Sequence, residues 1–94
     1  MQITFDPGKN RRNAADHDGV TFEEAKEVLS DAHALVREDD DATGEQRFVS
    51  LGGGAKDRIL VVIWTLRDNH ETIRLISAWK ANAQQRRRYE NQFV

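Results

Sequence analysis

The first third of the chain has the apolar spacing of helices. A helix is expected from Pro7 to about residue 15, with Asp6 as its N-cap. Proline is tolerated at the first helical position, because the N–H there would have no partner. A second helix is expected to start at Thr21 and to stop near residue 31. Thr21 and Glu24 form a capping box, in which the hydroxyl accepts from the Glu24 N–H and the carboxylate reaches back. The apolar face of this helix carries Phe22, Ala25, Leu29 and Ala32, with Val28 beside them.

The later part of the chain has the spacing of strands. Residues 59–64 are continuously apolar and rich in β-branched side chains, which predicts a central strand covered on both faces. Alternation in residues 72–78 places Leu75 and Ala78 on opposite faces. Turns are expected at residues 52–57 and 67–71, and such short links favour an antiparallel meander. The expected strands are residues 3–5, 35–38, 47–51, 59–64 and 72–78.

The C-terminal stretch from Lys80 to Phe93 is rich in helix-forming residues, and Tyr89 and Phe93, one turn apart, are expected to anchor this helix to the sheet. The predicted fold class is α+β. A short N-terminal strand and two helices precede an antiparallel sheet of about four strands and a C-terminal helix. A chain of 94 residues is expected to form one domain, residues 1–94.

The composition of the chain limits the kinds of site, the location and the partners that can be expected. The chain has no cysteine, which excludes disulfides and thiolate metal sites. It has no apolar run long enough to span a membrane and no signal peptide at its start, so a cytoplasmic location is expected. The net charge of −2 hides an asymmetry: residues 16–45 carry eleven acidic and two basic side chains, whereas residues 58–94 carry seven basic and three acidic ones. The second region would attract a polyanion.

Several motifs are better explained by structure than by chemistry. The glycines at 52–54 join two strands and lack the Gly-Lys-Ser/Thr ending of a phosphate loop, so a hairpin turn is expected. The acidic run at 38–41 lacks the ligand spacing of a calcium loop and is expected to be solvated or to attract a basic partner. His17, His33 and His70 have no metal-ligand spacing. Neither a metal nor another cofactor is expected.

His17 is the most interesting histidine, because it lies between the first two helices beside Asp16 and Asp18. It is either a proton-transfer group or a loop histidine bonded to the backbone.

Basic residues recur on or beside successive strands, and neighbouring strands are about 4.8 Å apart, so such side chains can form one patch a few phosphates wide. A ribonuclease that uses no metal needs such cations to stabilise the phosphorane, together with groups that take and give protons. The alternative is a solvated sheet face paired with acids. The run Arg86–Arg88 spans too much of a helix to face a single ligand. The strand-associated residues are Arg47, Arg58, Arg67, Arg74 and Lys80.

Six blocks, in order from about residue 3 to residue 90, resemble the BrnT toxins of type II toxin–antitoxin systems. The blocks are Asp6-Pro7-x-Lys9-x-x-x-Asn13, His17-x-Gly19-Val20-Thr21-Phe22-Glu23-Glu24-Ala25, Gly44-Glu45-x-Arg47-Phe48-Val49, Leu60-Val61-Val62, Ile73-Arg74-x-Ile76-Ser77-Ala78 and Arg86-Arg87-Arg88-Tyr89-Glu90. The resemblance implies a RelE-like fold and a ribonuclease that arrests translation. It also implies a BrnA-type antitoxin that forms a hetero-oligomeric complex with the toxin and is its only link to DNA.

The resemblance also implies which residues line the RNA site. The residues carried over as catalytic are Lys9, His17, Glu45, Arg47, Arg67 and Arg74. Those expected to contact RNA around them are Arg58, Trp79, Lys80, Arg86, Arg87 and Tyr89, of which Tyr89 is a packing or a base-stacking residue.

The chain departs from this family at three places. Trp79 stands where the family has arginine, so it either weakens or abolishes activity or stacks on a base. One extra residue and a lost lysine precede Gly19, which affects the placement of His17. The loop before Gly44 is unusually acidic, which suits a basic antitoxin. Two functions therefore remain: an active endoribonuclease, or an inactive toxin-like scaffold that binds protein or RNA.

Overall fold

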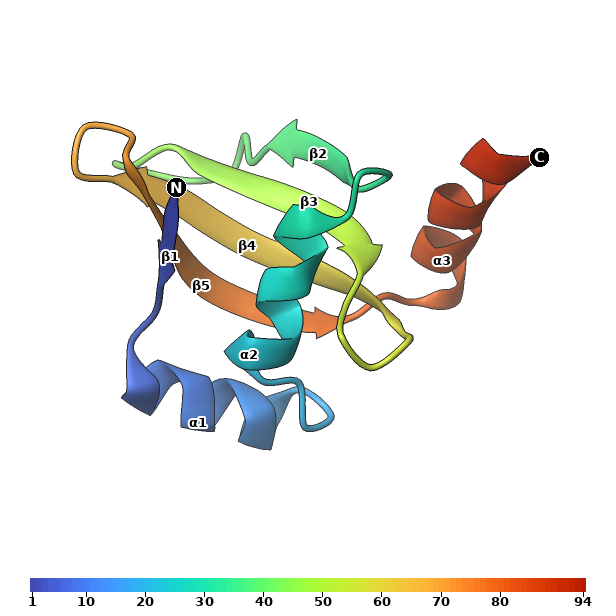
Figure 1. Ribbon diagram of the computed structural model, residues 1–94, viewed down its shortest axis with the longest axis horizontal. Helices are drawn as coiled ribbons and strands as arrows, with labels where there is room; N and C mark the ends of the chain where they lie inside the picture. Colours follow the sequence, from blue (N-terminus) through green and yellow to red (C-terminus); the bar gives the residue numbers. More distant parts are fainter.

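The computed structural model describes residues 1–94 and has an α+β architecture. Its sheet has five strands in the order β1-β5-β4-β3-β2. The strands are β1 (Gln2–Thr4), β2 (Leu35–Glu38), β3 (Arg47–Gly53), β4 (Ile59–Arg67) and β5 (Thr72–Lys80). The helices are α1 (Pro7–Asp16), α2 (Phe22–Ala25) with the 3-10 helix η1 (Lys26–Ser30), and α3 (Ala83–Glu90) with the 3-10 helix η2 (Asn91–Phe93). In Figure 1, α3 lies beyond the end of the sheet that β5 approaches. None of the helices has the length and apolar character needed to cross a membrane.

The helix starts follow local chemistry. The Asp6 carboxylate accepts from the Lys9 N–H at 3.2 Å, as expected for the N-cap before Pro7. Thr21 accepts from the Glu24 N–H at 3.1 Å, which confirms one half of the capping box. The helix that starts there ends at Ser30, near the expected position, but its second half is 3-10.

The four strands β2 to β5 form the expected antiparallel meander, and both β4 and β5 extend beyond their predicted ends. The N-terminal strand lies at the edge of the same sheet. It pairs in parallel with β5, from Gln2 beside Thr72 to Thr4 beside Arg74, so the sheet is mixed rather than purely antiparallel. This pairing leaves the outer edge of β5 beyond Arg74 open for other contacts.

A β-bulge in β5 overturns the predicted facing of two apolar residues. Leu75 and Ser77 pair with the consecutive residues Trp64 and Ile63, so Ile76 is an extra residue in the ladder. Beyond a bulge, alternation resumes out of phase. Leu75 and Ala78 therefore both point into the main core instead of to opposite faces. That core, between the sheet and α2, comprises Val20, Phe22, Ala25, Val28, Leu60, Val62, Leu75 and Ala78.

The turn predicted at residues 52–57 starts later than expected, because Gly52 and Gly53 belong to β3. A Cβ atom at Gly52 would lie 2.9 Å from Asp31 Oδ2 and 3.1 Å from the Ala34 Cβ. Glycine at this position therefore allows the segment after η1 to approach the strand closely.

Candidate functional site

Three arginines lie on the sheet face turned away from α2, which we call the outer face. Arg47 of β3 and Arg74 of β5 both pair with Thr65 of β4, so the three side chains project to the same side. Thr65 is next to Trp64, which packs against the main core, so this side is the outer face. Arg67 lies two residues beyond Thr65 and shares that face.

A carboxylate joins two of these arginines. Glu45 Oε1 lies 3.6 Å from Arg47 Nε, and Glu45 Oε2 lies 3.4 Å from Arg67 Nη2. All three side chains remain between 37% and 50% exposed, so these pairs are weak and a ligand can reach them. Arg74 has no carboxylate partner. We call Glu45, Arg47, Arg67 and Arg74 the arginine cluster. Four of the six predicted catalytic residues thus come together.

His17 lies at the other end of the outer face. It is the C-cap of α1, and its ring centroid is 5.8 Å from that of Trp79. Trp79 pairs with Val61, which is four residues before Thr65 on β4. At about 3.3 Å per residue, the row of Val61 and Trp79 lies roughly 13 Å along the sheet from the row of Thr65 and Arg74. Lys9 is exposed in the first turn of α1, and its ammonium group makes no ion pair. These two predicted residues therefore lie outside the cluster.

The Trp79 ring is part of the packing on the outer face. It is half-buried against a small apolar cluster of Leu51, Val61 and Ala81. The ring therefore fills space in this cluster in addition to bordering His17. A cation at this position would leave that packing incomplete.

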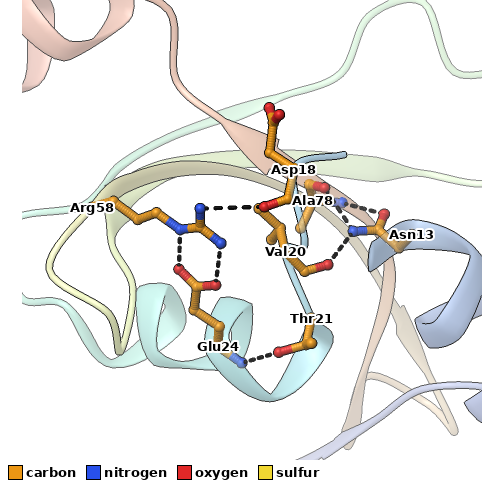
Figure 2. Close-up of polar contacts among 7 residues, drawn as sticks. All are labelled: Asn13, Asp18, Val20, Thr21, Glu24, Arg58 and Ala78. Atoms are coloured by element: carbon orange, nitrogen blue, oxygen red, sulfur yellow. Dashed lines mark hydrogen bonds and ion pairs between the residues drawn. The ribbon is translucent and has the colours of Figure 1, made fainter. Parts of the chain in front are cut away.

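Arg58 is committed to a buried carboxylate. Its Nε and Nη2 atoms each donate to Glu24 at 2.7 Å, and Nη1 donates to the Asp18 carbonyl at 3.4 Å (Figure 2). The side chain of Glu24 is only 1% exposed. The hydrogen bonds to Glu24 raise the pKa of Arg58 further, against the effect of burial. The predicted second half of the capping box is therefore wrong, because the Glu24 carboxylate turns to Arg58 instead of back to Thr21.

The remaining predicted contacts lie near α3. Lys80 and Arg86 line a shallow hollow that also contains two carboxylates, Asp57 and Glu90. Arg86 and Arg87 are both exposed, and Arg86 donates to the Ala81 carbonyl at 3.1 Å. A separate apolar groove on the outer face, between β2 and α3, is lined by none of the predicted catalytic residues. No group of three or more His, Cys, Asp or Glu side chains is placed to hold a metal ion.

Tyr89 has a packing role in this structure. Its ring packs against the cluster at Val61, and its hydroxyl donates to Asp31 Oδ2 at 2.6 Å. Burial alone would raise the pKa of Asp31, but hydrogen bonds from Gly53, Tyr89 and His33 outweigh it and lower that pKa. The same bond to Asp31, followed by burial, raises the pKa of Tyr89 to about 12. Phe93, predicted to anchor α3 to the sheet together with Tyr89, instead contacts the rings of Tyr89 and His33 and is 56% exposed. Of these two residues, only Tyr89 anchors α3 to the sheet.

We expect this bond to make stability sensitive to alkaline pH. Because the pKa of Tyr89 rises from 10.0 to about 12 on folding, its contribution is complete below pH 10 and is lost as pH rises through 12. The melting temperature should therefore fall more steeply between pH 10 and 12 in the unmodified protein than in Tyr89→Phe, as measured by thermal unfolding. Parallel curves for the two proteins would contradict this expectation.

The sequence pattern assigns no role to Asn13 or Thr65. Asn13 is only 7% exposed, although asparagine is usually exposed and α1 is a short polar helix. Thr65 follows the apolar run of β4 and donates to the Gln46 carbonyl. It pairs with Arg47 on one side and Arg74 on the other, so it lies between them. Only the register reveals that position.

Comparison with known proteins identifies the family and the fold. The model of the family described as the ribonuclease toxin BrnT of type II toxin–antitoxin systems matches residues 5–85. The crystal structure of the ribonuclease toxin BrnT from Brucella abortus is similar, with a TM-score of 0.65 and 26% sequence identity. The match covers 87% of this chain and 97% of that one. No curated protein matches the sequence.

Proposed function

Because the chain belongs to the BrnT family of ribonuclease toxins of type II toxin–antitoxin systems, we propose that it is an endoribonuclease. In this proposal it cleaves RNA without a metal ion and thereby inhibits translation. A toxin of this type has an antitoxin as partner and RNA as target. We propose further that a BrnA-type antitoxin neutralises it in a hetero-oligomeric complex in the cytoplasm, and that the toxin meets DNA only through this antitoxin.

The arginine cluster is the observation that supports this proposal best. Three arginines share one face of the sheet, and arginine binds phosphate oxygens through two parallel hydrogen bonds. During cleavage the 2′-oxygen attacks phosphorus, the bond to the 5′-oxygen breaks, and negative charge grows on the phosphoryl oxygens. Arg47, Arg67 and Arg74 stabilise that charge.

Glu45 is our choice for the proton acceptor, because it is the carboxylate in contact with the cluster. It takes the 2′-OH proton, while the departing 5′-oxygen takes a proton from a water molecule and leaves as a 5′-hydroxyl. His17 and Lys9, the other two predicted proton-transfer residues, lie outside the cluster. We assign His17 and Trp79 to the neighbouring part of the RNA, with Trp79 stacking on a base. The RNA phosphate backbone is also attracted by the positive charges of Lys80, Arg86 and Arg87. We leave Arg58 and Tyr89 out, because both are engaged within the protein.

The test is cleavage of a labelled single-stranded RNA by the purified protein in EDTA. We expect fragments that end in a 2′,3′-cyclic phosphate, because the attacking oxygen belongs to the RNA itself. Trp79→Arg, which restores the cation of the family, is tested beside the unmodified protein. Intact RNA with both proteins would refute the catalytic proposal.

One observation favours the second candidate, an inactive scaffold that binds an antitoxin or RNA. Trp79 replaces the expected cation and is used in packing. A scaffold should co-purify with a small DNA-binding partner without arresting growth when expressed. A plain RNA-binding module should bind with an affinity that falls steeply with salt and should leave the RNA intact.

A further inference from the structure

The loop that carries His17 is held at nearly every backbone polar group. The His17 N–H donates to the Asn13 carbonyl, and the Val20 N–H donates back to the His17 carbonyl, both at 2.9 Å. Asp18 and Gly19 adopt left-handed conformations with φ of 54° and 73°. Asp18 pays a small conformational cost there, which glycine does not. The carbonyls of Asp18 and Val20 both accept hydrogen bonds from side chains, Asp18 from Arg58 and Val20 from Asn13.

Asn13 ties this loop to β5. Its Nδ2 atom donates to the Val20 carbonyl at 2.9 Å and to the Ala78 carbonyl at 2.8 Å, while its Oδ1 accepts from the Ala78 N–H at 3.0 Å (Figure 2). The amide thus occupies the edge of β5 where β1 no longer pairs. Because Ala78 directly precedes Trp79, the same side chain fixes the loop relative to the indole that faces His17.

Arg58 secures the opposite side of the loop. The Glu24 carboxylate accepts hydrogen bonds from Nε and Nη2 of Arg58 at 2.7 Å, and these bonds orient the planar guanidinium. The remaining nitrogen, Nη1, then points at the Asp18 carbonyl. Glu24 itself is fixed by its burial at the start of α2. An arginine with 29% of its side chain exposed is thereby used to hold a backbone carbonyl next to His17.

We propose that Asn13 and Arg58, with Glu24 holding Arg58, are positioning residues that keep the imidazole of His17 against Trp79 at the rim of the outer face. The effect of this placement on RNA cleavage rests on the proposed function, whereas the placement of the imidazole itself does not. Arg58, expected from sequence to contact RNA, acts instead through the loop.

The experiment follows the His17 ring by NMR in the full chain labelled at histidine, with assignment by His17→Gln. The indole of Trp79 should displace the imidazole signals from their exposed values, and Trp79→Leu should remove that displacement. The test variant is Glu24→Leu with Arg58→Met, because replacing a buried ion pair with apolar residues of similar volume commonly preserves the fold. We expect its His17 signals to move toward those of Trp79→Leu, and its rate of RNA cleavage to fall at least about tenfold, a loss typical of a misplaced active-site group.

A matched control carries the same residue changes away from the loop, as Glu27→Leu with Arg37→Met, both exposed in the protein. It should retain the His17 signals and the cleavage rate. Arg58→Lys provides a second variant that keeps a charge beside Glu24 but lacks the planar fork. It should shift the His17 signals even if the double variant fails to fold.

His17 signals that stay unchanged in a folded variant would overturn the proposal. Shifted signals with unchanged cleavage would confirm the positioning role but refute its consequence for the reaction, since the loop position would then not matter for cleavage. Shifted signals in a protein that never cleaves RNA would leave the positioning role standing and refute the proposed function instead.

Discussion

Replacing Arg74 by alanine should lower the rate of RNA cleavage by about 100- to 1000-fold, the loss typical when one preorganised donor to a developing oxyanion is removed. Arg74 is the member of the arginine cluster without a carboxylate partner, so its charge is not already neutralised by Glu45. It also lies opposite Thr65, in the same row across the sheet as Arg47. The measurement is single-turnover cleavage of labelled RNA in EDTA.

The matched control is Arg12→Ala, which removes an exposed arginine of α1 that makes no ion pair. It should cleave at the rate of the unmodified protein, because both variants lose one positive charge and only Arg74 belongs to the cluster. The two variants should melt within a few degrees of one another. Equal cleavage rates for both would show that the arginine cluster is not where the phosphate reacts.

Replacing Arg58 by alanine should destabilise the protein by about 3 kcal/mol, because the Glu24 carboxylate would then be buried without a counter-charge. We take the lower end of the usual range, since the Arg58 side chain is partly exposed. In a domain of this size that loss corresponds to a fall in melting temperature of roughly 12–24 °C. Urea and thermal unfolding followed by circular dichroism provide the measurement.

The double variant Glu24→Leu with Arg58→Met separates charge burial from packing. It should recover most of the lost stability, because no unpaired charge remains in the interior. If Arg58→Ala alone were within about 0.5 kcal/mol of the unmodified protein, as is usual for a surface change, the pair would have to be an ordinary surface ion pair. Such a result would also remove the support for its role in holding the His17 loop.

Local chemistry explains why several elements could be predicted. Asp6 and Thr21 cap helices through bonds to backbone groups three residues away, so the signal lies within one short segment. The alternation of apolar and polar residues likewise identified β3 and β5, and the continuous apolar run of residues 59–64 identified β4. The C-terminal helix starts at Ala83 rather than at Lys80, since Asn82 and Gln85 form a capping box there.

Features that join distant segments were not predictable in the same way. The bulge at Ile76 depends on how β5 pairs with β4, and it reversed the expected facing of Ala78 relative to Leu75. Glu24 has the pattern of a capping box, yet an arginine 34 positions away is the stronger partner for its carboxylate. The parallel pairing of β1 with β5 also joins residues about 70 positions apart.

By itself, the sequence determined the order of the elements, the family and the set of basic residues from which a site is made, because these depend on residue types and short-range spacing. Only the tertiary structure decided which of those residues share a surface. Strand register brought Arg47, Arg67 and Arg74 to one face with Glu45, and it placed Trp79, which His17 borders, about 13 Å along the sheet from the Thr65 row. A contact between distant segments joined Arg58 to the buried Glu24. Register, bulges and ion pairs are contacts between segments far apart in the chain, and local spacing carries no information about them.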